Sequence, residues 1–311
     1  MAEMSNELVS IIIVTCGIRN YLSSLLDSIK KQTHHYLEIT VIDNSLCLDF
    51  KEKIGRYYPG IQVYSSPTNL FYCQAQNIGI KMSRGDFILC LNDDVVLDRS
   101  FIENALKGFS VNEKIGMVSG KILRKDATTI DSTGLFLTLW RTAKERGYGF
   151  KNKGQFVKEE YIFGVNGAVA FYRKSMLEEI KEEGNYFDPD FHMFYEDLDI
   201  AWRAQNKGWK GYYIPQALAY HVRGGTARQG QGIEKPFARR YLSDELQIDL
   251  IKNRYLTIIK NESFLRFLLH LPFIFLYDLI EWIFVLFSRP KLIKFFLSQI
   301  HYLRYTLKER K

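Results

Sequence analysis

The chain has 311 residues, of which 47% are hydrophobic and 25% are charged, so it is long enough to bury a large core. Its formal charge of +7 is uneven, because residues 264–311 hold eight Lys or Arg and three Asp or Glu, a net +5, and the remainder holds +2. Basicity confined to the tail excludes a broad nucleic-acid surface and favours a local anionic partner.

The cysteines and the first residues both indicate a cytosolic protein. There is no CxxC pair, and each cysteine lies in or beside an apolar segment, which predicts reduced, buried thiols and no zinc site. The first apolar run follows two glutamates and lacks a basic segment and a cleavage site, so we expect no signal peptide. The four cysteines are Cys16, Cys47, Cys73 and Cys90.

The first hundred residues alternate apolar runs of strand length with amphipathic stretches. Apolar residues spaced three and four apart predict helices, and short β-branched runs predict buried strands. The resulting β-α-β-α-β-α-β order predicts a mostly parallel sheet with right-handed crossovers. Strands are predicted at residues 8–14, 38–42, 61–64 and 87–91, and helices at 21–31, 50–58 and 75–82.

Polar residues follow three of these strands. Thr15 follows the first strand and Asp43 the second, and Asn92, Asp93 and Asp94 follow the fourth. The carboxyl ends of parallel strands share one sheet edge, where α/β proteins bind ligands. Oxygen ligands there suit Mg²⁺ or Mn²⁺ against a diphosphate, although turns and helix caps also use these residue types. No GxGxxG or GxxxxGK[ST] follows the first strand, which excludes the usual dinucleotide and P-loop sites.

The second half of the chain is less regular. Residues 124–160 are rich in glycine and charge and predict a hairpin or a long loop over the site. Ser100 and Ser175 are predicted to cap helices at 100–109 and 175–181, and a further helix is predicted from about Asp197 to 207. Strands are predicted at 115–123, at 165–172, at 209–214 as an edge strand, and at 217–221.

Glu196, Asp197 and His221 each allow a structural and a functional interpretation. Acidic residues at a helix start are stabilised by the helix dipole, and a single histidine in a loop is more often structural than catalytic. Catalysis or metal binding is the alternative, because titratable groups gathered at a sheet edge are candidates for both.

Taken together, these blocks resemble the family 2 glycosyltransferases, and most of all the branch that includes bacterial rhamnosyltransferases. The resemblance covers roughly residues 8–260, and it rests on the order and spacing of its blocks. It implies a GT-A fold, in which a mostly parallel α/β sheet with a Rossmann-like nucleotide-binding half is flanked by helices. The blocks are 9–15, Asp43-Asn44-Ser45, Asn69 with Asn77-Ile78-Gly79-Ile80, 85–95, 187–203 and 208–225.

The resemblance assigns five residues to the nucleotide-sugar donor. Thr15 and Asp43 would contact the nucleotide, with Asp43 near the base. Asn69 and Asn77 belong to the same binding set, and Asp93 would face the donor sugar or ribose. The chain departs from the family pattern at two places nearby. Cys16-Gly17 stands after the first strand where Tyr-Asn is common, and Phe71 stands where a glycine often follows Asn69.

The resemblance also implies a metal site and a catalytic base. Residues 92–94 occupy the place of the Asp-x-Asp motif, so Asp94 would bind a divalent cation, Mg²⁺ or Mn²⁺, and Asn92 replaces the first acid. His221 would complete the metal site. Asp197 would be the catalytic base, and Glu196 beside it would tune its proton affinity.

The implied reaction is the metal-dependent, inverting transfer of a sugar, with rhamnose suggested by the branch. The donor would be a nucleotide-diphosphate sugar, and the acceptor a hydroxyl of a saccharide or polyprenyl-linked saccharide in cell-surface polysaccharide synthesis. A catalytically silent GT-A-like binding or scaffold protein and a nucleotidyltransferase are the alternatives. Residues 1–260 are assigned to the GT-A domain, with a nucleotide-binding half at 1–98 and an acceptor-binding half at 99–260, and residues 261–311 to a helical C-terminal region.

The tail combines apolar and basic residues. Residues 264–287 have the length of a membrane span, but Pro272 and four polar residues on one side of the helical wheel interrupt them, namely Arg266, His270, Asp278 and Glu281. Residues 292–307 are amphipathic, with Lys291, Lys294, Arg304 and Lys308 on the polar side. We expect a peripheral protein on the cytoplasmic face of the membrane; a homo-oligomer interface or a cover for the core is the alternative.

Overall fold

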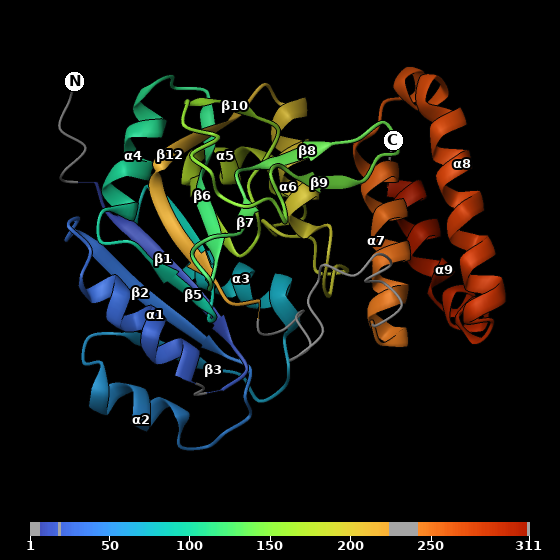
Figure 1. Cartoon of the computed structure of the whole chain (residues 1–311). Helices are drawn as coiled ribbons and strands as arrows, with labels where there is room; N and C mark the ends of the chain where they lie inside the picture. Colours follow the sequence, from blue (N-terminus) through green and yellow to red (C-terminus); the bar gives the residue numbers. More distant parts are fainter. Residues whose placement is uncertain (1–6, 18–19, 224–241, 310–311) are drawn as a thin grey trace.

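The structure is a computed structural model that describes residues 7–17, 20–223 and 242–309 (Figure 1). Its strands are β1 Val9–Thr15, β2 Leu37–Asp43, β3 Gln62–Ser65, β4 Phe87–Asn92, β5 Val95–Leu97, β6 Ile115–Arg124, β7 Ile130–Ser132, β8 Leu135–Leu137, β9 Ala143–Glu145, β10 Glu160–Ile162, β11 Val169–Arg173 and β12 Lys210–His221. Its helices are α1 Asn20–Lys30, α2 Phe50–Tyr57, α3 Phe71–Met82, α4 Phe101–Ser110, α5 Lys174–Ile180, α6 Glu196–Asn206, α7 Asp244–Asn261, α8 Phe264–Ser288 and α9 Lys291–Glu309.

One mixed sheet organises the described chain, in the order β10-β12-β6-β11-β4-β1-β2-β3. Strands β3, β2, β1 and β4 are parallel, as their alternation with helices predicted. Strand β11 is antiparallel to both of its neighbours, β4 and β6. The predicted α/β fold is therefore confirmed, and its antiparallel pairs involve β5, β7, β10 and β11.

Helices cover both faces of the sheet. Side chains of α1, α2 and α4 pack on one face, and side chains of α3, α5 and α6 pack on the other. Gly79 brings α3 close to β1, because a Cβ atom there would lie 2.3 Å from Ile12 Cγ2. This contact gives the small residue of the Asn77-Ile78-Gly79-Ile80 block a packing role.

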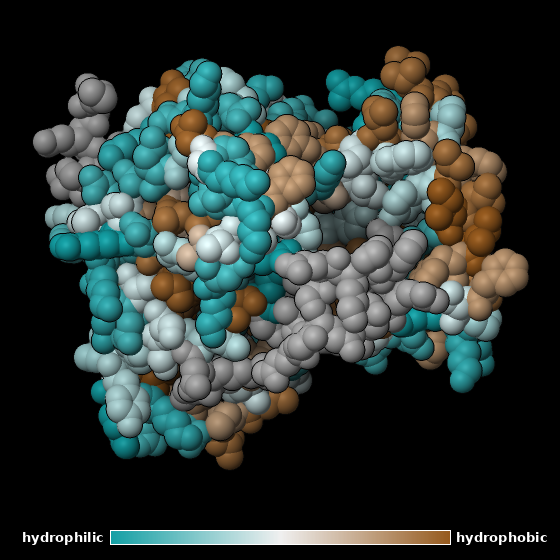
Figure 2. Space-filling view, in the orientation of Figure 1, coloured by the Kyte–Doolittle hydropathy of each residue, from teal (hydrophilic) through white to brown (hydrophobic). Residues whose placement is uncertain are grey.

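Helices α7, α8 and α9 form a separate cluster beside the sheet (Figure 1), around Ile248, Ile251, Val285 and Leu292. By length and composition alone, α8 is apolar enough to cross a membrane. Most of its large hydrophobic side chains are exposed, and Figure 2 shows hydrophobic residues gathered over it. Two of its polar residues face the protein, since Asp278 pairs with Arg254 of α7 and Glu281 accepts from Gln247 Nε2.

Several local predictions were wrong. Helix α3 begins at Phe71 and not near residue 75. The two strands expected at 209–214 and 217–221 are one strand, β12, with a register shift between Ile214 and Leu218, and it lies inside the sheet and not at its edge. Helix α7 was not predicted. The 124–160 segment does contain the expected hairpin, β8–β9.

The expected caps and buried thiols also need correction. Ser100 precedes α4 without making a side-chain cap bond, because its hydroxyl donates to Asp98 instead. Helix α5 begins at Lys174, so Ser175 lies inside the helix. Two of the four cysteines are buried, whereas Cys16 and Cys47, which were expected to be buried, are exposed because they follow strands into loops.

Candidate active site

The sheet register brings the predicted strand-end residues together. Thr15 pairs with Asp43 between β1 and β2, and Val14 pairs with Asn92 between β1 and β4. Thr15 Oγ1 donates to Asp93 Oδ2 at 2.6 Å, which links two of these strand ends directly. Asp43 is buried and accepts from the Ser45 backbone N–H at 2.8 Å, so its carboxylate also shapes the loop that follows β2.

A cavity of about 1080 Å³ opens beside these strand ends. It reaches from the edge of the sheet to the helices of the C-terminal cluster, where Leu250 of α7 and Tyr277 of α8 line it. One cavity therefore contains most of the residues that the sequence singled out. These are Asn92, Asp93, Asp94, Glu196, Asp197 and His221.

Asp94 and His221 lie side by side in the wall of this cavity. His221 ends β12 and pairs with Val95 of β5, which places it beside Asp94. His221 Nε2 lies 3.2 Å from Asp94 Oδ1, and both side chains are largely buried. A carboxylate oxygen and an imidazole nitrogen that converge are a donor set that a divalent cation can use.

The pair alone does not form a complete cage. Among the residues that the structure describes, no group of three or more His, Cys, Asp or Glu side chains is arranged to hold a metal ion. Mg²⁺ and related ions commonly take one or two protein ligands and fill the remaining positions with phosphate oxygens and water. The donor set therefore fits a cation that is shared with a diphosphate.

Glu196 and Asp197 open α6 at the opposite wall. The two residues before them have left-handed backbones, with φ of 73° at Phe194 and 71° at Tyr195. Side chains with a Cβ rarely adopt this conformation, and such strain is often found at functional sites. Asp197 Oδ2 accepts from the Gly167 N–H at 3.1 Å, and its Oδ1 accepts from the Leu198 N–H at 2.7 Å.

The two adjacent carboxyl groups are in unequal surroundings. Burial, and then the charge of Asp197, raises the pKa of Glu196 to about 8. Burial also raises the pKa of Asp197, but its hydrogen bonds from backbone N–H groups oppose this effect. Glu196 Oε2 has no hydrogen-bond partner among the described residues. A single proton shared by the pair therefore favours Glu196 and leaves Asp197 as the ionised carboxylate.

Glu145 is a further carboxyl group at this cavity, and its role was not predicted from sequence. It accepts hydrogen bonds from Ser132 Oγ and Asn166 Nδ2, and burial followed by the Asp197 charge raises its pKa to about 8. Asn166 lay in the glycine-flanked block at 164–167, which was a usable signal. Glu145 lay in the irregular 124–160 segment, which offered none.

Asn69 and Asn77, both predicted to bind the donor, do not line the cavity. Asn77 is buried, and its amide donates to the Phe187 carbonyl and accepts from the N–H groups of Tyr186 and Phe187. These bonds use its side chain to hold the 186–187 backbone. Asn69 is exposed and its side-chain oxygen accepts from the Phe71 N–H. Phe71 has a φ of 53°, a conformation that glycine adopts easily, which explains why glycine suits position 71.

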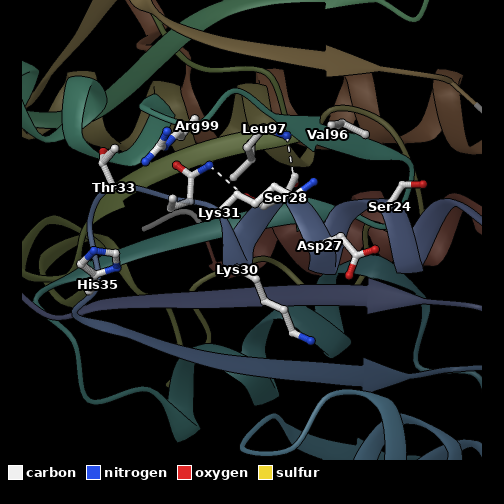
Figure 3. A pocket seen from close by; sticks show the side chains of 11 residues that line it. Ser24, Asp27, Ser28, Lys30, Lys31, Thr33, His35, Val96, Leu97 and Arg99 are labelled. Atoms are coloured by element: carbon white, nitrogen blue, oxygen red, sulfur yellow. Dashed lines mark hydrogen bonds between the residues drawn. The ribbon is translucent and has the colours of Figure 1, made fainter.

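A second cavity, of about 770 Å³, lies between α1 and the segment that follows β5 (Figure 3). Basic side chains of Lys30, Lys31 and Arg99 surround it, and Asp27 is its one carboxylate. None of the predicted site residues lines it. It is therefore not the candidate active site.

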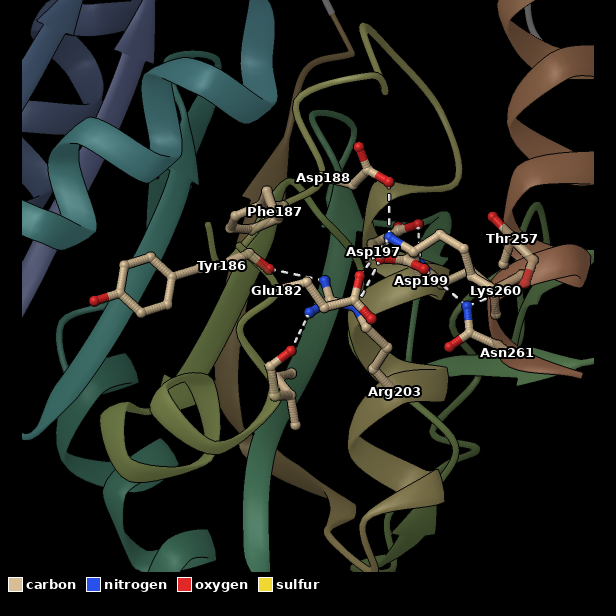
Figure 4. A network of polar contacts seen from close by, with 12 residues as sticks. Glu182, Tyr186, Phe187, Asp188, Asp197, Asp199, Arg203, Thr257, Lys260 and Asn261 are labelled. Carbon is tan, nitrogen blue, oxygen red and sulfur yellow. Dashed lines mark hydrogen bonds and ion pairs between the residues drawn. The ribbon is translucent and has the colours of Figure 1, made fainter. Parts of the chain in front are cut away.

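An ion-pair network lies behind α6 (Figure 4). Lys260 of α7 lies 2.7 Å from Asp188 and 3.7 Å from Asp199, and Asp199 also receives a hydrogen bond from Arg203 Nε at 2.9 Å. Burial alone would raise the pKa of Asp199, but the Arg203 and Lys260 charges outweigh it and lower the pKa. The network ties α6, which carries Glu196 and Asp197, to the C-terminal cluster.

Comparisons with known proteins agree with this fold. Residues 10–181, just over half of the chain, match the model of the family described as glycosyl transferase family 2. A poly-beta-1,6-N-acetyl-D-glucosamine synthase of Staphylococcus epidermidis is 24% identical over 179 residues, which cover 55% of this chain and 38% of that protein. A protein of the same name from Staphylococcus aureus is 24% identical over 47% of this chain and 32% of its own length. The chain therefore spans only about a third of these curated relatives.

Two solved structures share the architecture. One is GalNAc-T7 with UDP, GalNAc and Mn²⁺, with a TM-score of 0.61 and 15% identity over 82% of this chain and 48% of that one. The other is the mannosyltransferase PcManGT of Pyrobaculum calidifontis in complex with GDP-Man and Mn²⁺, with a TM-score of 0.56 and 14% identity over 83% of this chain and 66% of that one. At these identities the likeness shows the fold alone.

Proposed function

The chain belongs to glycosyl transferase family 2, and from this premise we propose that it transfers a sugar from a nucleotide-diphosphate sugar to an acceptor hydroxyl with inversion. The observation that carries the proposal is the single cavity that brings Asp94 and His221 opposite Asp197. The presence of all three also argues against a silent scaffold. A nucleotidyltransferase is disfavoured, because no glycine-rich phosphate loop follows β1.

The donor lies, in this proposal, along the ends of β1, β2 and β4. Thr15, Asp43 and Asp93 contact the nucleoside and the sugar, while Asp94 and His221 hold Mg²⁺ or Mn²⁺ and Asn92 supports them. When bound, the cation stabilises the negative charge that grows on the leaving diphosphate. Solved proteins of the same fold with Mn²⁺ and UDP or GDP-Man support this assignment.

Asp197 serves as the general base in one displacement step. The acceptor oxygen forms a bond to the anomeric carbon, the bond from that carbon to the diphosphate oxygen breaks, and Asp197 takes the hydroxyl proton. Hydrogen bonds from the Gly167 and Leu198 N–H groups orient this carboxylate and favour its ionised form against the effect of burial. Glu196 holds a proton nearby, which removes a competing charge from the acceptor pocket.

The acceptor is proposed to enter from the side of α8. Leu250 and Tyr277 form that end of the cavity, and Tyr277 belongs to the helix whose apolar face is exposed. A lipid-linked saccharide could place its sugar near Asp197 and its chain beside α8. We therefore propose a role in cell-surface polysaccharide synthesis at the cytoplasmic face of the membrane, with rhamnose as one candidate sugar. The alternative is that copies of the chain associate through these helices.

The proposed roles are assigned to the three residue ranges that were predicted from the sequence. Residues 1–98 carry the strand ends that contact the donor, and residues 99–260 carry Asp197, His221 and the hairpin. Residues 261–311 supply the membrane-facing helices. Arg304 and Lys308, which were expected on the basic face of α9, lie outside the described side chains, and the glycines at 224 and 225 lie outside the described residues.

A binding screen tests the donor assignment. The full chain is titrated by calorimetry with UDP-, GDP- and dTDP-linked sugars, including dTDP-rhamnose, with Mn²⁺ and with EDTA. At least one sugar nucleotide should bind, and EDTA should weaken that binding by more than tenfold. Asp94→Asn should reproduce the effect of EDTA. Equal binding by the variant and the wild-type chain would remove the assigned cation site.

Vesicle flotation tests the α8 assignment. The exposed side chains of Leu265, Leu269 and Phe275 are changed together to Glu, and the control changes exposed Leu48, far from α8, to Glu. On vesicles of phosphatidylethanolamine and phosphatidylglycerol, the triple variant should lose at least tenfold in partitioning, because about 25 cal/mol per Å² of apolar burial is removed. Unchanged flotation with a smaller mass in sedimentation would instead identify α8 as a subunit interface.

A further inference from the structure

Asp131 on β7 is a buried acid that neither the motifs nor the proposed reaction has used. Its side chain is fully buried and does not line the cavity. Three cations or donors surround it, since Asp131 Oδ1 lies 2.5 Å from Arg223 Nε and 3.9 Å from Arg124 Nε, and Oδ2 lies 2.9 Å from His221 Nδ1. An ionised carboxylate is very costly to bury without such partners, so its position is strongly determined.

The contact with His221 determines which ring nitrogen carries a proton. A carboxylate can only accept a hydrogen bond, so the proton of this bond resides on Nδ1. When the imidazole binds a cation, its lone pair must be on the other nitrogen, Nε2, and that atom faces Asp94 Oδ1. The contact also fixes the rotation of the ring. Asp131 is itself held in place, because it lies on β7 and β7 pairs with β6.

We propose that Asp131 is a positioning residue that orients His221 and its tautomer for the divalent cation. This inference rests on the proposed function, because it requires that His221 is a metal ligand. Carboxylates that accept from a metal-ligating histidine raise the basicity of that ligand, and their removal typically weakens metal affinity by about 10–100-fold. Asp131 acts through His221 and touches no substrate, which distinguishes it from Asp94 and Asp197.

A purely structural role is the competing explanation, because Asp131 also pairs with Arg223. Asp199 is a matched control, since it too is a fully buried carboxylate paired with an arginine, and its partners do not include His221. Both Asp131→Asn and Asp199→Asn should lower the thermal midpoint. Only Asp131→Asn should change the affinity for the cation.

The test is a titration of the full-length chain with Mn²⁺ alone, followed by the electron paramagnetic resonance signal of the free ion. Asp131→Asn should bind Mn²⁺ about 10–100-fold more weakly than the wild type, Asp199→Asn should match the wild type, and His221→Ala should lose binding. If His221→Ala loses binding while Asp131→Asn binds within twofold of the wild type, the positioning role is overturned and the cation site stands. If His221→Ala binds as the wild type does, the cation site itself is wrong.

A second measurement covers the case in which Asp131→Asn does not fold. In the wild-type chain with Mg²⁺ and UDP, ¹⁵N spectra of the histidine side chains report which ring nitrogen is protonated. The proposal predicts that His221 is protonated on Nδ1 and unprotonated on Nε2. A proton on Nε2 alone would overturn it.

Discussion

The two walls of the cavity are built in different ways. On the donor side, Asn92 lines the cavity, and Thr15 and Asp43, which are buried and do not line it, end the neighbouring parallel strands in register with it. On the acceptor side, Asn166 reaches Glu145 across 21 positions and Gly167 reaches Asp197 across 30, through bonds that involve side chains. A substitution on the donor side should therefore remove only the contacts of that residue. A substitution on the acceptor side should also displace neighbouring residues, because side-chain bonds hold them in place.

The largest expected effect is on catalysis at the acceptor wall. Asp197→Asn keeps the size of the side chain and removes its ability to take a proton, so transfer should fall by about 10²–10⁴-fold. Donor affinity should stay within about twofold, because Asp197 lies on the opposite wall. The rate at which nucleoside diphosphate is released in a single turnover measures transfer, and calorimetry measures the donor affinity. Near-normal turnover would assign the base elsewhere, with Glu145 as the next candidate.

The next effect is on the support of that wall. Asp199→Ala leaves Arg203 and Lys260 without their shared carboxylate, and removing one partner of a buried pair costs about 3–5 kcal/mol. Denaturant unfolding measures the loss. The exposed pair of Glu52 and Arg56 is the control, since Glu52→Ala should cost less than about 1 kcal/mol. Equal losses in the two variants would contradict the supporting role of the network.

A smaller effect is expected at the donor wall. Thr15→Val removes the hydrogen bond to Asp93 Oδ2 and keeps the shape of the side chain, which should cost about 0.5–1.5 kcal/mol, or up to about tenfold in donor affinity. Thr15→Ser retains the hydroxyl and should bind the donor as the wild type does. A Thr15→Val variant with unchanged donor affinity would show that this bond does not shape the donor site.

The smallest effect concerns pH. Catalysis requires Asp197 to be ionised, so the rate should fall as the pH drops through its raised pKa. Glu196 is already neutral below its pKa of about 8, so Glu196→Gln should leave the acid limb set by Asp197 in place. The rate at pH 8 should change less than tenfold. An acid limb that moves to lower pH in this variant would mean that Glu196 carries a charge while Asp197 titrates, and would contradict the assignment of the shared proton to Glu196.

The donor wall was predictable from sequence because its geometry follows from local patterns. Apolar runs identified β1, β2 and β4, and parallel topology then required Thr15, Asp43 and residues 92–94 to meet at one edge. Asn77 could not be separated from these residues by pattern, because its role depends on a backbone segment 110 positions away. The family resemblance, and not the local pattern, pointed to Asp197 and His221.

The acceptor wall was less accessible to prediction. Glu145 and Asp131 lie in a segment without hydrophobic periodicity, and their partners are distant in sequence. Pro215 and the register shift in β12 divided one interior strand into two apparent strands. On α8, the polar arc was visible in the sequence, but only the structure shows that it faces the protein and leaves the apolar face exposed.

The most direct test of the central proposal is to follow sugar nucleotides by ³¹P NMR with the full-length chain and Mn²⁺. At least one sugar nucleotide should be converted slowly to its nucleoside diphosphate and free sugar, with water in place of the acceptor hydroxyl; EDTA should stop this conversion, and added divalent cation should restore it. Asp94→Asn should convert none at a measurable rate. Conversion that continues undiminished in EDTA and in Asp94→Asn would contradict the proposed cation-assisted transfer.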